Sequence, residues 1–227
     1  MSSTLLVIAK QPIPGQSKTR LCPPLTSETA AALYACFLRD TLALARQVPA
    51  VRHEIVYLPT AAADYFQALA PDMAQSVQCG ADLGARLDHA LTAALAAGAV
   101  AAVAIGSDSP TLPATYVARA FALLTSHDLV LGPSDDGGYY LIGLRHPQPR
   151  LLREVTMSTP TVLRDTLAIA AELGLQVALL PPWYDVDTVA ELTRLRAELR
   201  SAPPGVAVHT RAFLATLDGP DTPATPG

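Results

Sequence analysis

The chain has 227 residues, of which 50% are hydrophobic, and its formal net charge is −4. This length and apolar content are enough for one large buried core. The acidic balance, and the lack of basic clusters beyond residues 10–20, exclude nucleic acid as the main partner. The odd, widely spaced cysteines (Cys22, Cys36 and Cys79) suit a reducing compartment, and no apolar run approaches the ~20 residues of a membrane helix. We therefore expect a cytoplasmic protein that acts on a small molecule.

Apolar runs typical of strands alternate with amphipathic segments typical of helices. We expect strands at 4–9, 53–58, 76–79, 100–105, 128–131, 139–144 and 175–180. We expect helices from Thr26 to about Gln47 and at 83–97, 113–125, 160–173 and 189–201. This order predicts an α/β fold: a mainly parallel, three-layer Rossmann-like sheet with helices on both faces. We predict one domain over residues 1–217 and a disordered Pro- and Thr-rich tail at 218–227.

The loop after the first strand concentrates positive charge at a strand's carboxyl end, where α/β folds bind phosphates. Its candidate phosphate-binding residues are Lys10, Gly15, Lys18, Thr19 and Arg20. A P-loop is excluded because Ser17 rather than glycine precedes Lys18, and because prolines interrupt the loop. Side-chain cations would therefore neutralise the phosphates. A merely solvated basic loop is the competing interpretation.

Two further segments place carboxylates at strand ends. Asp108 follows the strand at 100–105 within Gly106-Ser107-Asp108-Ser109-Pro110, and a simple turn explains this segment about as well as a site does. Asp187 follows the last predicted strand and belongs at the same edge. Because Mg²⁺ prefers one or two carboxylates plus phosphate oxygens, Asp108 and Asp187 are the predicted metal ligands.

Helix capping is the alternative for the late acids, and it is stronger for Asp185 than for Asp187. The segment also matches the Asp-x-Asp-x-Thr pattern of haloacid-dehalogenase-type phosphatases. That nucleophile belongs after the first strand of its domain, so the late position excludes this reading.

Two adjacent acids, Asp135 and Asp136, precede Gly137-Gly138 between two predicted strands. They could orient or deprotonate an acceptor hydroxyl, and the same residues predict a hairpin turn equally well. Asp82 is a further candidate ligand contact, although a helix N-cap is its favoured role.

Taken in order, these motifs resemble the glycosyltransferase-like family DUF2064 of the nucleotide-diphospho-sugar transferase (GT-A) superfamily. The resemblance rests on residues 10–21, 80–84, 106–110, 132–141 and 185–188 and covers roughly residues 4–200. It implies a GT-A fold, a nucleotide over the first loop and a divalent metal, Mg²⁺ or Mn²⁺, near Asp108. The family is also similar to phospholactate guanylyltransferases and molybdopterin-cofactor nucleotidylyltransferases. By that similarity Lys18 and Arg20 bind phosphates, and Asp108 and Asp187 bind the metal.

The chain departs from the family pattern at Met157, where the family has Trp, and at Val189, where it has Pro. We expect a metal-dependent glycosyltransferase-like enzyme with a nucleotide-sugar donor and a small-molecule acceptor, in which Asp108, Asp135 and Asp136 are catalytic. A nucleotidyltransferase that releases pyrophosphate and a non-catalytic nucleotide-binding module are the alternatives.

Overall fold

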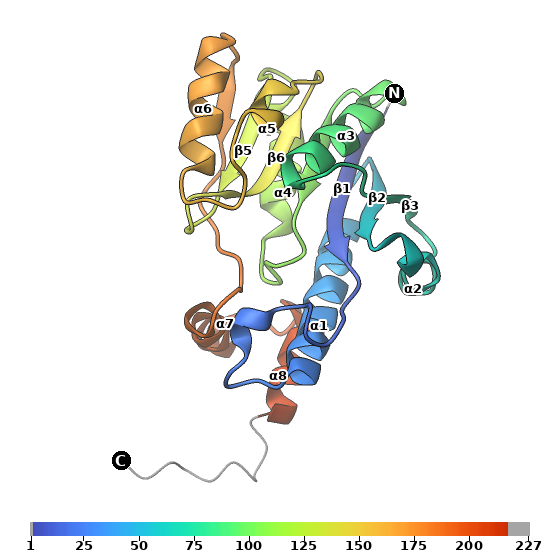
Figure 1. Ribbon diagram of the computed structural model, residues 1–227, viewed down its shortest axis with the longest axis vertical. Helices are drawn as coiled ribbons and strands as arrows, with labels where there is room; N and C mark the ends of the chain where they lie inside the picture. Colours follow the sequence, from blue (N-terminus) through green and yellow to red (C-terminus); the bar gives the residue numbers. More distant parts are fainter. Residues whose placement is uncertain (1, 218–227) are drawn as a thin grey trace.

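The computed structural model describes residues 2–217, which form a seven-stranded mixed sheet with helices on both faces (Figure 1). The strand order is β3-β2-β1-β4-β6-β5-β7, and only β6 runs antiparallel to its neighbours. The strands are β1 (Ser3–Lys10), β2 (Val51–Leu58), β3 (Ala74–Val77), β4 (Ala102–Ile105), β5 (Leu129–Pro133), β6 (Tyr139–Leu144) and β7 (Val177–Leu179). All seven predicted strands are confirmed, and the predicted tail at 218–227 lies outside the described residues.

The five predicted helices are confirmed as α1 (Ser27–Arg46), α3 (Leu83–Ala96), α4 (Ala114–Leu123), α6 (Val162–Glu172) and α7 (Val189–Ser201). Sequence reasoning missed α2 (Ala63–Leu69), α5 (Arg150–Arg153), α8 (Val208–Leu217) and the 3₁₀ turns η1 (Thr19–Leu21) and η2 (Thr60–Ala62). Thr26 caps α1, and Thr188 with Glu191 forms the expected capping box of α7. No helix within residues 2–217 is long and apolar enough to span a membrane.

Alternate residues of the strands point to opposite faces and build two separate cores. Leu5 and Val7 of β1 pack with α1, α2 and α4, whereas Leu6 packs on the other face with α3, α5 and α6. Burial on both faces explains why β1 and β4 are almost continuously apolar.

A third hydrophobic cluster lies beyond the carboxyl end of the sheet, where Figure 1 shows α7 and α8 beside the amino-terminal half of α1. Leu33 and Phe37 of α1 meet Leu195 of α7 and Leu214 of α8 in this cluster. Helix α1 therefore belongs both to the sheet core and to this cluster.

Asp40 of α1 anchors α8, because its buried carboxylate accepts hydrogen bonds from His209 N at 2.9 Å and Thr210 N at 2.8 Å. We expect Asp40→Ala to lower the free energy of unfolding by about 2–3 kcal/mol, since two backbone donors lose a charged acceptor. Urea denaturation followed by circular dichroism measures this change, with Asp64→Ala on the exposed surface of α2 as control. Equal urea midpoints for Asp40→Ala and Asp64→Ala would show that the Asp40 hydrogen bonds do not contribute to stability.

Candidate active site

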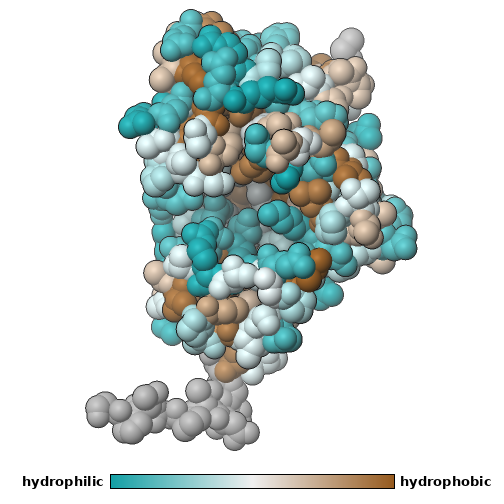
Figure 2. All heavy atoms as spheres, in the orientation of Figure 1, coloured by the Kyte–Doolittle hydropathy of each residue, from teal (hydrophilic) through white to brown (hydrophobic). Residues whose placement is uncertain are grey.

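A cleft of about 810 Å³ opens at the carboxyl edge of the sheet. It is lined by the ends of β1 and β4, the loop before η1, the start of α3, the β5–β6 hairpin and residues 157–162. In Figure 2, hydrophilic residues gather across the middle of the face in view, between the sheet and the lower helices. The position agrees with the ligand crevice of open α/β sheets.

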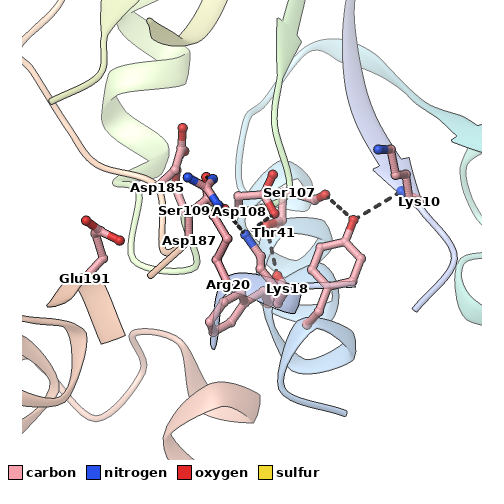
Figure 3. Close-up of polar contacts among 12 residues, drawn as sticks. Lys10, Lys18, Arg20, Thr41, Ser107, Asp108, Ser109, Asp185, Asp187 and Glu191 are labelled. Carbon is pink, nitrogen blue, oxygen red and sulfur yellow. Dashed lines mark hydrogen bonds and ion pairs between the residues drawn. The ribbon is translucent and has the colours of Figure 1, made fainter. Parts of the chain in front are cut away.

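Lys18 lies at the centre of the polar contacts in the cleft (Figure 3). Its Nζ is 2.5 Å from Asp108 Oδ1 and 2.7 Å from Asp187 Oδ1, and its side chain is only 5% exposed. The rings of Tyr34 and Phe37 lie on its apolar side, each with its centroid 5.8 Å from Nζ. Burial disfavours the ammonium ion, but Asp108 and Asp187 outweigh that cost and raise the pKa of Lys18. Lys18 is therefore a fixed positive charge.

A tight turn directs Lys18 inward. Ser17 Oγ accepts a hydrogen bond from Ile13 N at 3.0 Å, and Ser17 N donates to Ile13 O at 3.0 Å. Gly15 lies inside this turn at φ +74°, and Lys18, the residue just before η1, has φ +50°. Gly15 thus shapes the loop and is not among the residues that line the cleft.

Arg20 adds a second positive charge. Its Nη2 lies 2.5 Å from Asp187 Oδ2, while its side chain is 66% exposed. Burial alone would raise the pKa of Asp187, but Lys18 and Arg20 together hold that pKa below its ordinary value. Asp187 therefore holds both cations on one side of the cleft.

Asp185 also lines the cleft, although its sequence position suggested capping. Residues 184–187 alternate in burial, with Tyr184 and Val186 in the third cluster and the two acids facing the cleft. Asp185 accepts a hydrogen bond from Ser109 Oγ at 2.5 Å. Burial, followed by the charge of Asp108, raises the pKa of Asp185 to about 6.

The other predicted residues divide into two groups. Lys10, Thr19 and Asp136 line the cleft, whereas Asp82 and Asp135 do not. Asp82 caps α3 by accepting from Ala85 N at 2.8 Å. Asp135 forms an ion pair with Arg194 of α7 at 2.5 Å. The residues around Asp136 form the predicted hairpin, since β5 and β6 pair antiparallel.

Sequence reasoning missed a buried hydrogen-bond chain beside Lys18. Tyr34 Oη lies 2.8 Å from Ser107 Oγ and accepts from Lys10 N at 3.1 Å, so it ties α1 to the ends of β1 and β4. Gln78 and Arg86 also line the cleft without having been predicted. No local motif marks Tyr34 and Gln78, because their partners are distant in sequence.

The donor set suits a divalent cation bound together with phosphate. Among residues 2–217, no group of three or more His, Cys, Asp or Glu side chains is arranged to hold a metal. Asp108 and Asp187 nevertheless converge on one point, since an oxygen of each contacts Lys18 Nζ. Two carboxylates are enough for Mg²⁺ when phosphate and water complete its ligands.

Comparisons with known proteins agree with this architecture. The family model described as "Uncharacterized protein conserved in bacteria (DUF2064)" matches residues 41–159. A crystal structure described as a candidate nucleotide-diphospho-sugar transferase from Desulfovibrio desulfuricans G20 is 35% identical, with a TM-score of 0.88 over 96% of both chains. No curated protein matches the chain.

Two more distant structures share the fold. CMP:2-keto-3-deoxy-manno-octonic acid synthetase in complex with CTP is 12% identical, with a TM-score of 0.56 over 88% of this chain and 99% of its own. Rv0371C of Mycobacterium tuberculosis H37Rv in complex with manganese is 20% identical, with a TM-score of 0.51 over 89% of this chain and 100% of its own.

Proposed function

Because the chain belongs to the DUF2064 family, and a 35%-identical neighbour is described as a candidate nucleotide-diphospho-sugar transferase, we propose that it is a metal-dependent transferase with a nucleotide-sugar donor. The acceptor in this proposal is a small molecule that carries a hydroxyl group. The observation that carries the proposal is the buried Lys18 ammonium held by Asp108 and Asp187 at the carboxyl edge of the sheet.

In this reaction Lys18 and Arg20 bind the donor diphosphate. A bond forms between the acceptor oxygen and the anomeric carbon of the sugar, while the bond from that carbon to the diphosphate oxygen breaks. The electron pair leaves with the nucleoside diphosphate, and the hydroxyl proton passes to Asp136. Lys18 stabilises the charge that develops on the leaving group without reorganising, because its contacts already fix it.

Asp108 and Asp187 would hold the divalent ion. When bound, such an ion supplies further neutralisation of the leaving diphosphate.

Nucleotidyl transfer from a nucleoside triphosphate, with release of pyrophosphate, is the second candidate. The observation in its favour is that Lys18 and Arg20 contact opposite oxygens of the same carboxylate, Asp187. Two cations at one point suit the larger charge of a triphosphate.

A thermal-shift screen with Mg²⁺ separates the two candidates. A ligand at 100 times its Kd stabilises the protein by about 2.7 kcal/mol. For a chain of this size that corresponds to a rise in Tm of roughly 5–10 °C. We expect nucleoside-diphospho-sugars to give this shift and to yield nucleoside diphosphate during turnover. A shift from triphosphates alone, with pyrophosphate as product, would establish the second candidate. No shift from either class would refute both.

A further inference from the structure

The basic residues of the cleft all come from one side of its central strand. Lys10, Lys18 and Arg20 follow β1, and Arg86 lies on α3, which follows β3. In the sheet, β1, β2 and β3 lie on one side of β4, whereas β6, β5 and β7 lie on the other, and Lys18 and Arg20 reach Asp187, which follows β7. The wall formed by the β5–β6 hairpin and residues 157–162 is called the hairpin wall below.

The hairpin wall contains no basic residue among the described residues that line the cleft. Its one charged group is Asp136. The nearby cations do not line the cleft and form ion pairs of their own, Arg153 with Asp88, Arg164 with Asp165 and Arg194 with Asp135. A phosphate or carboxylate bound here would face Asp136 with no compensating cation from this wall, which is unfavourable.

The two segments of the hairpin wall are packed closely enough to act as one unit. A Cβ added at Gly137, which has φ +89°, would lie 2.1 Å from Pro160 O. Leu163 N donates a hydrogen bond to Gly137 O at 3.0 Å. The hairpin therefore fixes the position of residues 157–162.

Two polar groups on this wall are available to a ligand. Ser158 adopts φ +61°, a left-handed conformation that is uncommon for residues other than glycine, and its Oγ has no hydrogen-bond partner within residues 2–217. Asp136 Oδ1 accepts from Gly138 N at 2.9 Å, while Oδ2 accepts no bond from the described residues. Strained backbone at a binding surface is typical of functional sites.

We propose that the hairpin wall is the acceptor subsite, in which Asp136 and Ser158 bind an uncharged polyol. Asp136 Oδ2 accepts from the reacting hydroxyl and takes its proton during transfer, and Ser158 Oγ binds a neighbouring hydroxyl. Lys18 and Arg20, which Asp187 holds, remain with the donor diphosphate. This inference rests on the proposed function, since it assigns the second substrate of the same cleft.

Matched acceptor pairs that differ by one phosphate test the charge preference. The pairs are glycerol with glycerol 3-phosphate, glucose with glucose 6-phosphate, and myo-inositol with myo-inositol 1-phosphate. Transfer is measured from a radiolabelled nucleotide-sugar that gives a thermal shift. We expect a neutral acceptor to be used with a kcat/KM at least about tenfold above that of its phosphorylated partner. Asp136→Asn, on the exposed hairpin, is expected to lower kcat for the neutral acceptor by at least about 100-fold with the donor Kd unchanged, because the proposed base is lost.

Ser158→Gly tests the serine without a risk to folding, because glycine accepts the left-handed backbone more readily. We expect the KM for the acceptor to rise by about tenfold, as for one lost hydrogen bond, with the KM for the donor unchanged. Ala50→Gly is the matched control, since Ala50 also has φ +60° but lies at an exposed turn outside the cleft.

The outcomes separate this inference from the proposed function. Equal or better use of phosphorylated acceptors, an unchanged acceptor KM in Ser158→Gly, or failure of all three polyols with a bound donor would overturn the inference alone. Failure of every nucleotide-sugar to bind would overturn the proposed function first.

Discussion

Replacement of Lys18 by methionine is expected to lower kcat/KM for the donor by about 1000-fold, near the upper range for loss of one preorganised charge. The variant keeps the length of the apolar stem and removes only the ammonium that Asp108 and Asp187 share. In the absence of ligand those two acids would lose the cation that they share, while Arg20 would still pair with Asp187. Donor phosphates would then meet net negative charge at the point where the wild-type protein presents a cation.

The stability change in Lys18→Met is expected to be smaller than its effect on activity. Asp108 and Asp187 are 40% and 32% exposed at the side chain, so water can solvate them after the cation is lost. We expect the free energy of unfolding to fall by about 1–3 kcal/mol. Steady-state kinetics and calorimetric titration below the melting transition measure the functional loss.

Arg46→Met is the control, because it removes an exposed ion pair with Asp72 away from the cleft. A nucleotide Kd in Lys18→Met within twofold of the wild-type value would show that Lys18 does not bind phosphate.

Asp108→Asn is expected to remove the Mg²⁺-dependent part of nucleotide affinity, a loss of at least about 100-fold. The amide has the shape of the carboxylate but lacks its charge, so it is a poor ligand for Mg²⁺ and a weaker partner for Lys18. Calorimetric titrations with nucleotide in Mg²⁺ and in EDTA give the metal-dependent part directly. In the wild-type protein, chelation is expected to weaken binding by the same factor.

Asp72→Asn is the matched control, because Asp72 also pairs with a basic residue but lies on the surface. If Asp108→Asn gained as much affinity from Mg²⁺ as the wild-type protein, Asp108 would not be a metal ligand.

The central strands of the sheet were predictable from the sequence, because strands that are buried on both faces are continuously apolar. The strand residues Leu5, Leu6 and Val7 are all buried, so the apolar run that they form identifies a central strand without ambiguity. The caps Thr26 and Thr188 were likewise predictable, because capping depends on contacts within three residues.

Helices α2 and α5, with 7 and 4 residues, are too short for a periodic pattern in the sequence. Helix α8 is held by Asp40, a contact across 169–170 positions that no local pattern shows.

The sequence predicted that the candidate site lies at the carboxyl edge of the sheet, but not which side chains contact one another there. Strand ends indicated which loops meet there, and the structure places Lys18, Asp108 and Asp187 in direct contact. Asp135 and Asp136 are adjacent in sequence, and only their three-dimensional partners distinguish the surface pair with Arg194 from the cleft residue.

Asp185 was undervalued because capping explained it. The alternation of Tyr184 and Val186 with the two acids was a usable signal, since an extended segment places every second residue on the same face.

Helix α1 has a consequence for how ligands bind. Its 20 residues run without interruption from the sheet core to the third cluster, so a continuous hydrogen-bonded backbone spans both sides of the cleft. The conformational entropy of bringing these sides together is therefore lost during folding, before any ligand arrives. Binding energy from the nucleotide is then available for affinity and transition-state stabilisation instead of for assembling the site.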